Sequence, residues 1–297
     1  MLNHILKGDI RHISYEDIDR DSYDQCLLGS DHFRIYASSW YLDAVAERWD
    51  LLVLDDYQAV MPLPRRYKFG LAYVYTPVFV QQLGVFSKGS ISVDLERQFF
   101  KKAASKYFLF DYFTHSVPKG MDGISQRINY ILSLEEQHIE LQKKYNTNRK
   151  RSLKNSFEKL RVDKNGAQDL FLDHYRTMDQ GFPVTNEMLV KLDRLIAASN
   201  QQIKIWNVFE KDTWIGGLVW VVDHKRVTYL VPVVSDQGRL KQASALLIDT
   251  LIQDHQKSGL ILDFEGSMLP GVAQFYRSFG AEREIYYYFK KRGYGLL

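Results

Sequence analysis

The sequence has very little cysteine: Cys26 is the one thiol among 297 residues. A single thiol cannot form an intrachain disulfide, so a disulfide framework is excluded and a cytoplasmic setting is expected. No motif surrounds Cys26, which indicates a small buried or surface thiol rather than a nucleophile. None of the eight histidines lies three to five residues from another His or from the cysteine, so no metal site is expected.

Glycine and proline are also scarce, with 18 and 7 residues. Such a composition argues against disorder and against a fold built from loops. Long apolar runs are missing as well, because the longest dense one, Trp214–Val222, has about half of the roughly 20 residues that span a bilayer. The start of the chain, Met1–Asp9, lacks the apolar run of a signal peptide. We therefore expect no membrane anchor.

An excess of charge of one sign is missing too, since 39 basic and 36 acidic side chains leave a formal net charge of +3. This balance does not indicate a nucleic-acid-binding protein by itself, and any basic surface must be local. The one dense basic segment is Asn148–Lys154. It could contact tRNA or a phosphorylated lipid head group, or it could be a solvated helix face, which is the commoner role of such runs.

Hydrophobic residues make up 45% of the chain, including 19 Tyr and 17 Phe, which is enough for a substantial core. In the first half, apolar spacing and turn residues predict helices and strands in alternation. The predicted helices are Ser39–Trp49 and Val93–Lys106, and the predicted strands are Leu51–Leu54, Ala59–Leu63, Tyr73–Val80, Tyr107–Phe113 and Arg127–Leu132.

The second half opens with a polar helical stretch, Glu135–Leu160, and continues with a similar order of elements. The predicted helices are Asp169–Gln180, Asn186–Ala198, Lys241–Lys257 and Gly271–Phe279, and the predicted strands are Ile203–Phe209, Trp214–Val222, Val227–Val234, Leu260–Phe264 and Glu284–Lys290. Because both halves follow the order helix, hairpin, strand, helix, strand and strand, we expect two units of similar α/β architecture, 1–134 and 135–297. There is no residue-level repeat.

Three common catalytic signatures are missing: Gly-x-Gly-x-x-Gly, the Gly-Lys-Ser/Thr phosphate loop and Gly-x-Ser-x-Gly. What remains is the run Val227–Gly280, whose order of elements resembles the GNAT superfamily of N-acyltransferases. The phrases Leu262–Ser267, Pro270-Gly271 and Phe275–Gly280 resemble the Fem-type branch, which contains the peptidoglycan aminoacyltransferases; Thr76-Pro77 and Gln81–Gly84 resemble it more loosely. The resemblance implies two tandem GNAT-like domains, each a mixed sheet flanked by helices.

The resemblance also implies where a site would lie. A GNAT site opens where two parallel strands separate, here Val227–Val234 and Leu260–Phe264. Free backbone N–H groups past Val231 would hold a thioester carbonyl. Tyr276 stands four residues before Gly280, the GNAT spacing for a general acid, although a half-buried aromatic residue is an equal alternative. Glu265 and Asp263 follow the buried strand and are the candidate carboxylates. Glu265 could deprotonate an amine or hold its ammonium form. The alternative role of these carboxylates is a helix cap or a surface ion pair.

For the donor, the resemblance implies acetyl-CoA or another acyl-CoA, with its pyrophosphate at the helix that begins near Gln242. The residues implied in binding it are Val231, Val233, Val234, Gln237, Gly238, Arg239, Leu240, Lys241 and Gln242. The segment departs from the coenzyme A loop, because Leu240, Gln242 or Ser244 stands where glycine or alanine would let backbone approach phosphate. Arg239 and Lys241 could compensate by charge. A Fem-like protein with an aminoacyl-tRNA donor would show the same departure.

The function expected from the sequence is transfer of an acetyl or aminoacyl group from a thioester or ester donor to an amine. The acceptor would be a small molecule or a cell-wall precursor. A tRNA partner is a weaker expectation, because the long helical hairpin of tRNA-using Fem enzymes is not visible. The alternative is a binding or scaffold protein that keeps the GNAT fold without its chemistry.

Overall fold

A computed structural model describes residues 8–179, 181–266 and 268–292. The chain forms two compact units: the first comprises residues 1–127 and 285–297, and the second residues 128–284. The sequence predicted a division between residues 134 and 135 instead. The difference arises because strands β7 (Ile124–Ser133) and β13 (Glu282–Arg292) each contribute residues to both units.

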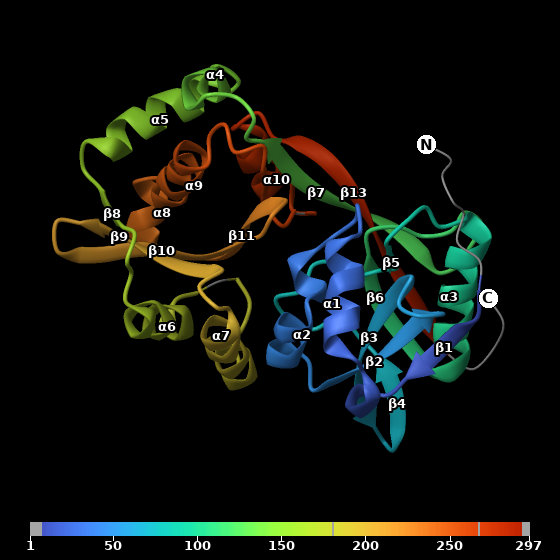
Figure 1. Cartoon of the computed structure of the whole chain (residues 1–297). Helices are drawn as coiled ribbons and strands as arrows, with labels where there is room; N and C mark the ends of the chain where they lie inside the picture. The colour runs from blue at the N-terminus through green and yellow to red at the C-terminus, as the bar shows by residue number, and fades with distance from the viewer. Residues whose placement is uncertain (1–7, 180, 267, 293–297) are drawn as a thin grey trace. The chain divides into compact units, whose positions relative to one another are not determined.

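The first unit is a mostly antiparallel sheet in the order β1-β2-β3-β4-β6-β13, with β5 beside β3. Its strands are β1 (Ile10–Ile13), β2 (Arg48–Leu54), β3 (Ala59–Lys68), β4 (Leu71–Val74), β5 (Phe86–Ser87), β6 (Leu109–Thr114) and the end of β13. Helices α1 (Arg20–Leu28) and α2 (Ser39–Val45) cover one face, and α3 (Val93–Lys106) covers the other (Figure 1). Strands β4 and β6, which α3 connects, form its parallel pair.

The second unit has the sheet order β7-β12-β11-β10-β9-β8. Its strands are the end of β7, β8 (Arg161–Asp163), β9 (Ile203–Glu210), β10 (Thr213–Val222), β11 (Arg226–Val234) and β12 (Ile261–Asp263). Its helices are α4 (His138–Lys143), α5 (Thr147–Phe157), α6 (Gln168–Thr177), α7 (Asn186–Ala198), α8 (Asp236–Leu240), α9 (Ala243–Asp254) and α10 (Pro270–Arg277). Helix α9 connects β11 and β12, the parallel pair of this unit.

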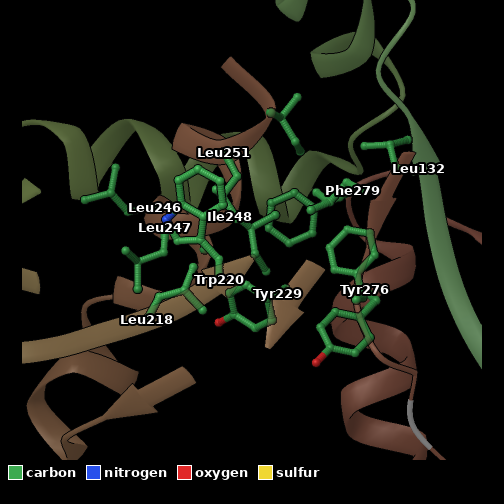
Figure 2. Close-up of a cluster of buried hydrophobic side chains, with 14 of the residues drawn as sticks. Leu132, Leu218, Trp220, Tyr229, Leu246, Leu247, Ile248, Leu251, Tyr276 and Phe279 are labelled. Carbon is green, nitrogen blue, oxygen red and sulfur yellow. The ribbon is translucent and has the colours of Figure 1, made fainter. Parts of the chain in front are cut away.

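Each unit thus has one parallel strand pair joined through a helix, which accounts for the similar order of elements in the two halves of the sequence. In the second unit, helices α4, α5 and α9 lie on one side of the sheet, and α6 and α7 lie on the other (Figure 1). The core under α9 is apolar: Figure 2 shows Leu246, Leu247 and Leu251 of this helix in one cluster with Trp220 and Tyr276. This burial is the main source of stability for the unit.

Two predicted elements of the first half end earlier than expected. The predicted helix Ser39–Trp49 stops at Val45, because Trp49 lies in β2, where it pairs with Pro64 of β3 and is buried against Tyr23. The predicted strand Tyr73–Val80 stops at Val74. Beyond it, Pro77 has no N–H to donate and Phe79 has a φ of 64°, so neither continues a strand.

In the second half, the predicted stretch Glu135–Leu160 is divided into α4 and α5, because Asn146 caps α5 by accepting from the Arg149 N–H at 2.8 Å. The predicted helix Lys241–Lys257 is shorter, Ala243–Asp254, and the separate helix α8 precedes it. Helix α6 ends at Thr177, and Gln180, the predicted end, lies outside the described residues. The other predicted elements are present with small differences at their ends, except that β3 continues to Lys68 rather than ending at Leu63. Helix α1 and strands β1, β5 and β8 were not predicted.

Candidate functional site

Strand β11 continues beyond the end of its shorter parallel partner β12. They are paired from Arg226 with Ile261 to Thr228 with Asp263, and β12 ends there. Strand β11 continues to Val234, paired on its other side with β10 across a bulge at Leu230. Within the described part of the chain, the segment Tyr229–Val234 therefore has no strand partner on the β12 side. This is the opening from which backbone N–H groups could reach a ligand.

Tyr276 lies beside this opening. Helix α10 places its ring 4.8 Å from the ring of Phe264, just after β12, and 6.5 Å from that of Tyr229, on β11. Figure 2 shows the hydroxyl groups of both tyrosines on the same margin of the core cluster, away from α9. Burial raises the pKa of the Tyr276 phenol far above its ordinary value, and Tyr229, Glu265 and Asp263 raise it further. Tyr276 is therefore a protonated donor at neutral pH.

Glu265 occupies a tight turn directly after β12. Its φ is 56°, and its N–H donates to Asp263 Oδ1 at 2.9 Å. The next residue, Gly266, has a φ of 62°, and a Cβ there would lie 2.4 Å from the carbonyl oxygen of Ile128. Only glycine permits this approach of the turn to β7. The turn fixes the direction in which the partly buried Glu265 side chain leaves the sheet.

Asp263 is buried and bound by protein groups. Oδ1 accepts from Asn129 Nδ2 at 2.9 Å, and Oδ2 accepts from Arg226 Nη1 at 2.7 Å. Arg226 also donates to Glu284, with Nη2 2.6 Å from Oε1. The structure thus assembles a polar cluster of four residues: Asn129, Arg226, Asp263 and Glu284. Asp263 and Glu265 do not share one strand face, because the strand ends between them.

Sequence reasoning missed Asn129, Arg226 and Glu284. One signal could have identified Arg226: it is the charged first residue of an otherwise apolar strand. A charged residue in a buried strand is usually paired, which predicts a partner for Arg226. Its partners lie 37 and 58 positions away, and no local pattern connects them.

The segment expected to bind the donor is a short helix rather than an open loop. Ser235 caps α8 by accepting from the Gly238 N–H at 3.1 Å. A Cβ at Gly238 would lie 2.0 Å from the carbonyl oxygen of Ile215, so this glycine lets α8 rest on β10. Val231, Val233 and Val234 are buried along β11, whereas Leu240 is 85% exposed.

The polar side chains of this segment already have protein partners. Gln237 and Lys241 both contact Glu210, and Arg239 pairs with Asp236. Gln242 has a φ of 62° and is the residue directly before the first turn of α9. A pocket of about 250 Å³ opens there, lined by Arg239, Gln242, Ser244, Ala245 and Phe275.

Among residues 8–179, 181–266 and 268–292, no group of three or more His, Cys, Asp or Glu side chains could hold a metal ion. Within the same residues, no helix is both long and apolar enough to cross a bilayer.

Comparison with known proteins rests on structure, because neither a protein-family model nor a curated protein matches the sequence. FemX has a TM-score of 0.65 at 11% identity, with 95% of this chain and 97% of FemX covered. A tandem GNAT protein from the clavulanic acid biosynthesis pathway has a TM-score of 0.56 at 10% identity, covering 97% and 100%.

A conserved protein of unknown function from Bacteroides thetaiotaomicron is similar too, with a TM-score of 0.59 at 12% identity over 94% of this chain and all of that one. Likeness at such low identity concerns the fold. The chain therefore has the mixed α/β fold of two tandem GNAT-like halves, as the sequence predicted.

Proposed function

We propose that this chain is an acyltransferase that moves an acetyl or aminoacyl group from a thioester or ester donor to an amine. The observation that carries the proposal is that β11 continues beyond Thr228 without β12 beside it. Tyr276 and Glu265 lie next to this open edge of β11. A fold alone does not imply a reaction, so the proposed activity depends on the geometry of this site.

In the proposed reaction, the amine attacks the donor carbonyl carbon, a C–N bond forms, and the C–S or C–O bond to the leaving group breaks. Backbone N–H groups of β11 in the segment Val231–Val234 would stabilise the oxyanion; Pro232 has no N–H, so it cannot contribute. Glu265 would take the proton that the attacking nitrogen loses. Tyr276 would give its phenol proton to the departing thiolate or alkoxide.

We assign Asp263 a positioning role rather than a role as base. Both of its carboxylate oxygens accept hydrogen bonds from protein groups, and one of these donors is the backbone N–H of Glu265. The carboxylate therefore holds the turn that carries Glu265. A base needs a free lone pair directed at the substrate, which this arrangement does not offer.

The donor is either an acyl-CoA or an aminoacyl ester of tRNA, and its phosphates would lie at the α8–α9 junction, near Gln237–Gln242. The acceptor class in the proposal is a small-molecule amine or a cell-wall precursor. The resemblance of the sequence to the Fem-type branch, which contains the peptidoglycan aminoacyltransferases, supports the aminoacyl version, and the fold is similar to that of FemX.

The second candidate function is a binding or scaffold protein that keeps the fold without catalysis. One observation favours it: helix α8 occupies the place where a coenzyme A loop of small residues would run, and Gly238 in it serves packing. Such a protein would bind a donor or an acceptor without turning it over.

Two measurements test these functions. Calorimetry with acetyl-CoA, longer acyl-CoAs and aminoacyl-tRNA at low salt identifies the donor, and single-turnover assays with amine acceptors then test transfer. We expect Tyr276→Phe to lower the transfer rate by about 10²–10⁴-fold, a typical contribution of a general acid. Tyr175→Phe, at a buried tyrosine of α6, is the matched control. Unchanged turnover in Tyr276→Phe rules out the acid role, and donor binding without any transfer supports the scaffold.

A further inference from the structure

The hairpin of β3 and β4 in the first unit ends in a turn of two residues, Phe69 and Gly70. Lys68 pairs with Leu71 across this turn, and the φ angles of the two turn residues are 51° and 76°. Turns of this kind favour Asn or Asp before the glycine, because those residues tolerate a positive φ. A phenylalanine is strained at this position, so the turn itself does not explain why Phe69 is there.

The side chains at the tip of the hairpin, Tyr67–Leu71, are largely apolar and exposed. Phe69 is 93% exposed, Tyr67 is 64% exposed and Leu71 is 46% exposed. Figure 1 shows β4 projecting from the end of the first unit's sheet, at the bottom of the view. Exposed apolar residues are ordinary when they are scattered, whereas neighbouring ones mark an interaction surface. The tip therefore presents an apolar surface that the core of the first unit does not use.

The same end of the sheet carries further exposed groups on the neighbouring strands. Tyr73 of β4 lies beside Leu109 of β6, and Leu109 pairs with Arg292 of β13. Phe108, directly before β6, is 41% exposed, and Arg292 is exposed as well. The apolar tip thus has a further aromatic ring and a cation at its border.

The charge around the tip is positive. No Asp or Glu stands between Asp56 and Asp94, and the sequence between them contains four cations: Arg65, Arg66, Lys68 and Lys88. The two arginines form ion pairs with Asp50 and Glu47. Among residues 8–179, 181–266 and 268–292, no carboxylate pairs with Lys68 or Arg292. The tip and its border are therefore cationic and attract an anionic partner.

A bilayer surface that contains anionic lipid fits these features. Aromatic and aliphatic side chains enter the interface between head groups and acyl chains, while lysine and arginine stay at the phosphates. A protein partner needs about 800 Å² of matching surface on each side, which a projecting turn does not provide. A single-stranded nucleic acid needs ring faces and cations in succession, whereas Leu71 cannot stack and both arginines are paired within the protein.

We propose that the β3–β4 hairpin is a membrane-docking element: Phe69 and Leu71 insert into the interface of an anionic bilayer, and Lys68 contacts lipid phosphates. Docking of this kind is peripheral and reversible, because few side chains insert and the remaining attraction is electrostatic and screened by salt. It uses neither the donor nor the acceptor of the proposed reaction, so it holds whether or not the chain catalyses acyl transfer.

The experiment is flotation of the full chain with vesicles of phosphatidylglycerol and phosphatidylcholine, compared with vesicles of phosphatidylcholine alone. We expect binding to the anionic vesicles that weakens as salt rises. Phe69→Asn should weaken this binding by about tenfold or more, since it removes the inserted ring. The melting temperature of this variant should be equal or higher, because asparagine suits the turn, so a loss of binding would not come from unfolding. Phe69→Trp should keep the binding, because tryptophan favours the interface.

Matched variants separate insertion from general effects. Phe182→Asn makes the same change at an exposed phenylalanine of the second unit and should leave binding within about twofold. Lys68→Glu should weaken binding by about tenfold or more, because repulsion by the lipid phosphates replaces attraction. Lys88→Glu makes the same change of charge beside Gln58, near the other end of β3, and should have a smaller effect.

Failure of the unaltered chain to bind the anionic vesicles overturns the proposal, and so does equal binding by Phe69→Asn and Phe182→Asn. Two further results, each without vesicle binding, would assign the hairpin to another partner and overturn the proposal as well. One is binding of a single-stranded RNA that Phe69→Asn abolishes. The other is self-association in sedimentation velocity that the same variant abolishes.

Discussion

The Arg226 guanidinium and the Asp263 carboxylate form a buried ion pair in which Nη1 lies 2.7 Å from Oδ2. Glu284 shares the same guanidinium. We predict that Arg226→Met destabilises the chain by about 3–5 kcal/mol, because it leaves one buried and one partly buried carboxylate without their cation. Urea unfolding measures the loss. Arg239→Met breaks the exposed pair with Asp236 and should stay within about 0.5 kcal/mol; equal losses in both variants would contradict a special role for the buried pair.

Gly266 and Gly271 lie five positions apart, and replacing each by alanine should change the stability of the protein in opposite directions. At Gly266, φ is 62° and a Cβ would meet the Ile128 carbonyl oxygen at 2.4 Å, whereas at Gly271, in α10, a Cβ would meet nothing within 4 Å. Gly266→Ala should destabilise by more than about 1 kcal/mol, and Gly271→Ala should stabilise by about 0.4–1 kcal/mol. Thermal unfolding of both variants checks the signs. Because Gly266 supports the turn of Glu265, any transfer activity should fall only in Gly266→Ala.

Parts of the fold that depend on local signals could be predicted from the sequence. Helices α3 and α7 have the predicted bounds, because Ser92 and Thr185 cap them by accepting from the N–H groups of Leu95 and Met188. Local pattern was enough for these two helices because each capping residue lies within a few residues of the helix start. The role of Tyr276 was implied by a family resemblance, through its spacing to Gly280, and stays a prediction.

The rest depends on contacts between distant residues. Nothing near Arg149 in the sequence indicates that it turns inward while Lys150 and Arg151 stay exposed. Its partners Gln242 and Ser278 are 93 and 129 positions away. The pairing of β13 with β6 is equally remote, because β13 returns from the end of the chain to the first unit. Pairing of that kind is decided by tertiary packing, which overrides the local pattern.

Asp50 should make stability depend on pH in the acid range. Burial raises the pKa of this carboxyl, but contacts with His12, Arg65 and Tyr107 outweigh burial and hold the pKa well below its ordinary value. A carboxyl with a depressed folded-state pKa stabilises fully above its unfolded pKa of about 3.9, and the stabilisation is lost as pH falls through the folded value. The advantage of the unaltered chain over Asp50→Asn in unfolding free energy should therefore be constant above about pH 5 and shrink below pH 4. An advantage that grows on acidification would reverse this sign.

Cys26 should be unreactive in the folded protein. Its side chain is fully buried in α1, and burial raises the pKa of the thiol to about 11. Only the thiolate attacks disulfide reagents, so both access and ionisation are suppressed at pH 8. We expect an aromatic disulfide reagent to label the native chain slowly, at the rate of unfolding, and to label one thiol per chain at once in denaturant. Fast native labelling would place Cys26 at the surface.

Ionisation of the Tyr276 phenol should not lower the transfer rate at alkaline pH. Burial raises the pKa of its phenol far above the ordinary value, and Tyr229, Glu265 and Asp263 raise it further. The proton needed for the leaving group is then present throughout the accessible pH range, so a fall in transfer rate between pH 8 and about pH 10 must come from another group. The pH profile of kcat/KM, measured for the unaltered chain and for Tyr276→Phe, tests this. The two profiles should have the same shape and differ in height, whereas an alkaline limb that disappears in Tyr276→Phe would show that the phenol ionises there.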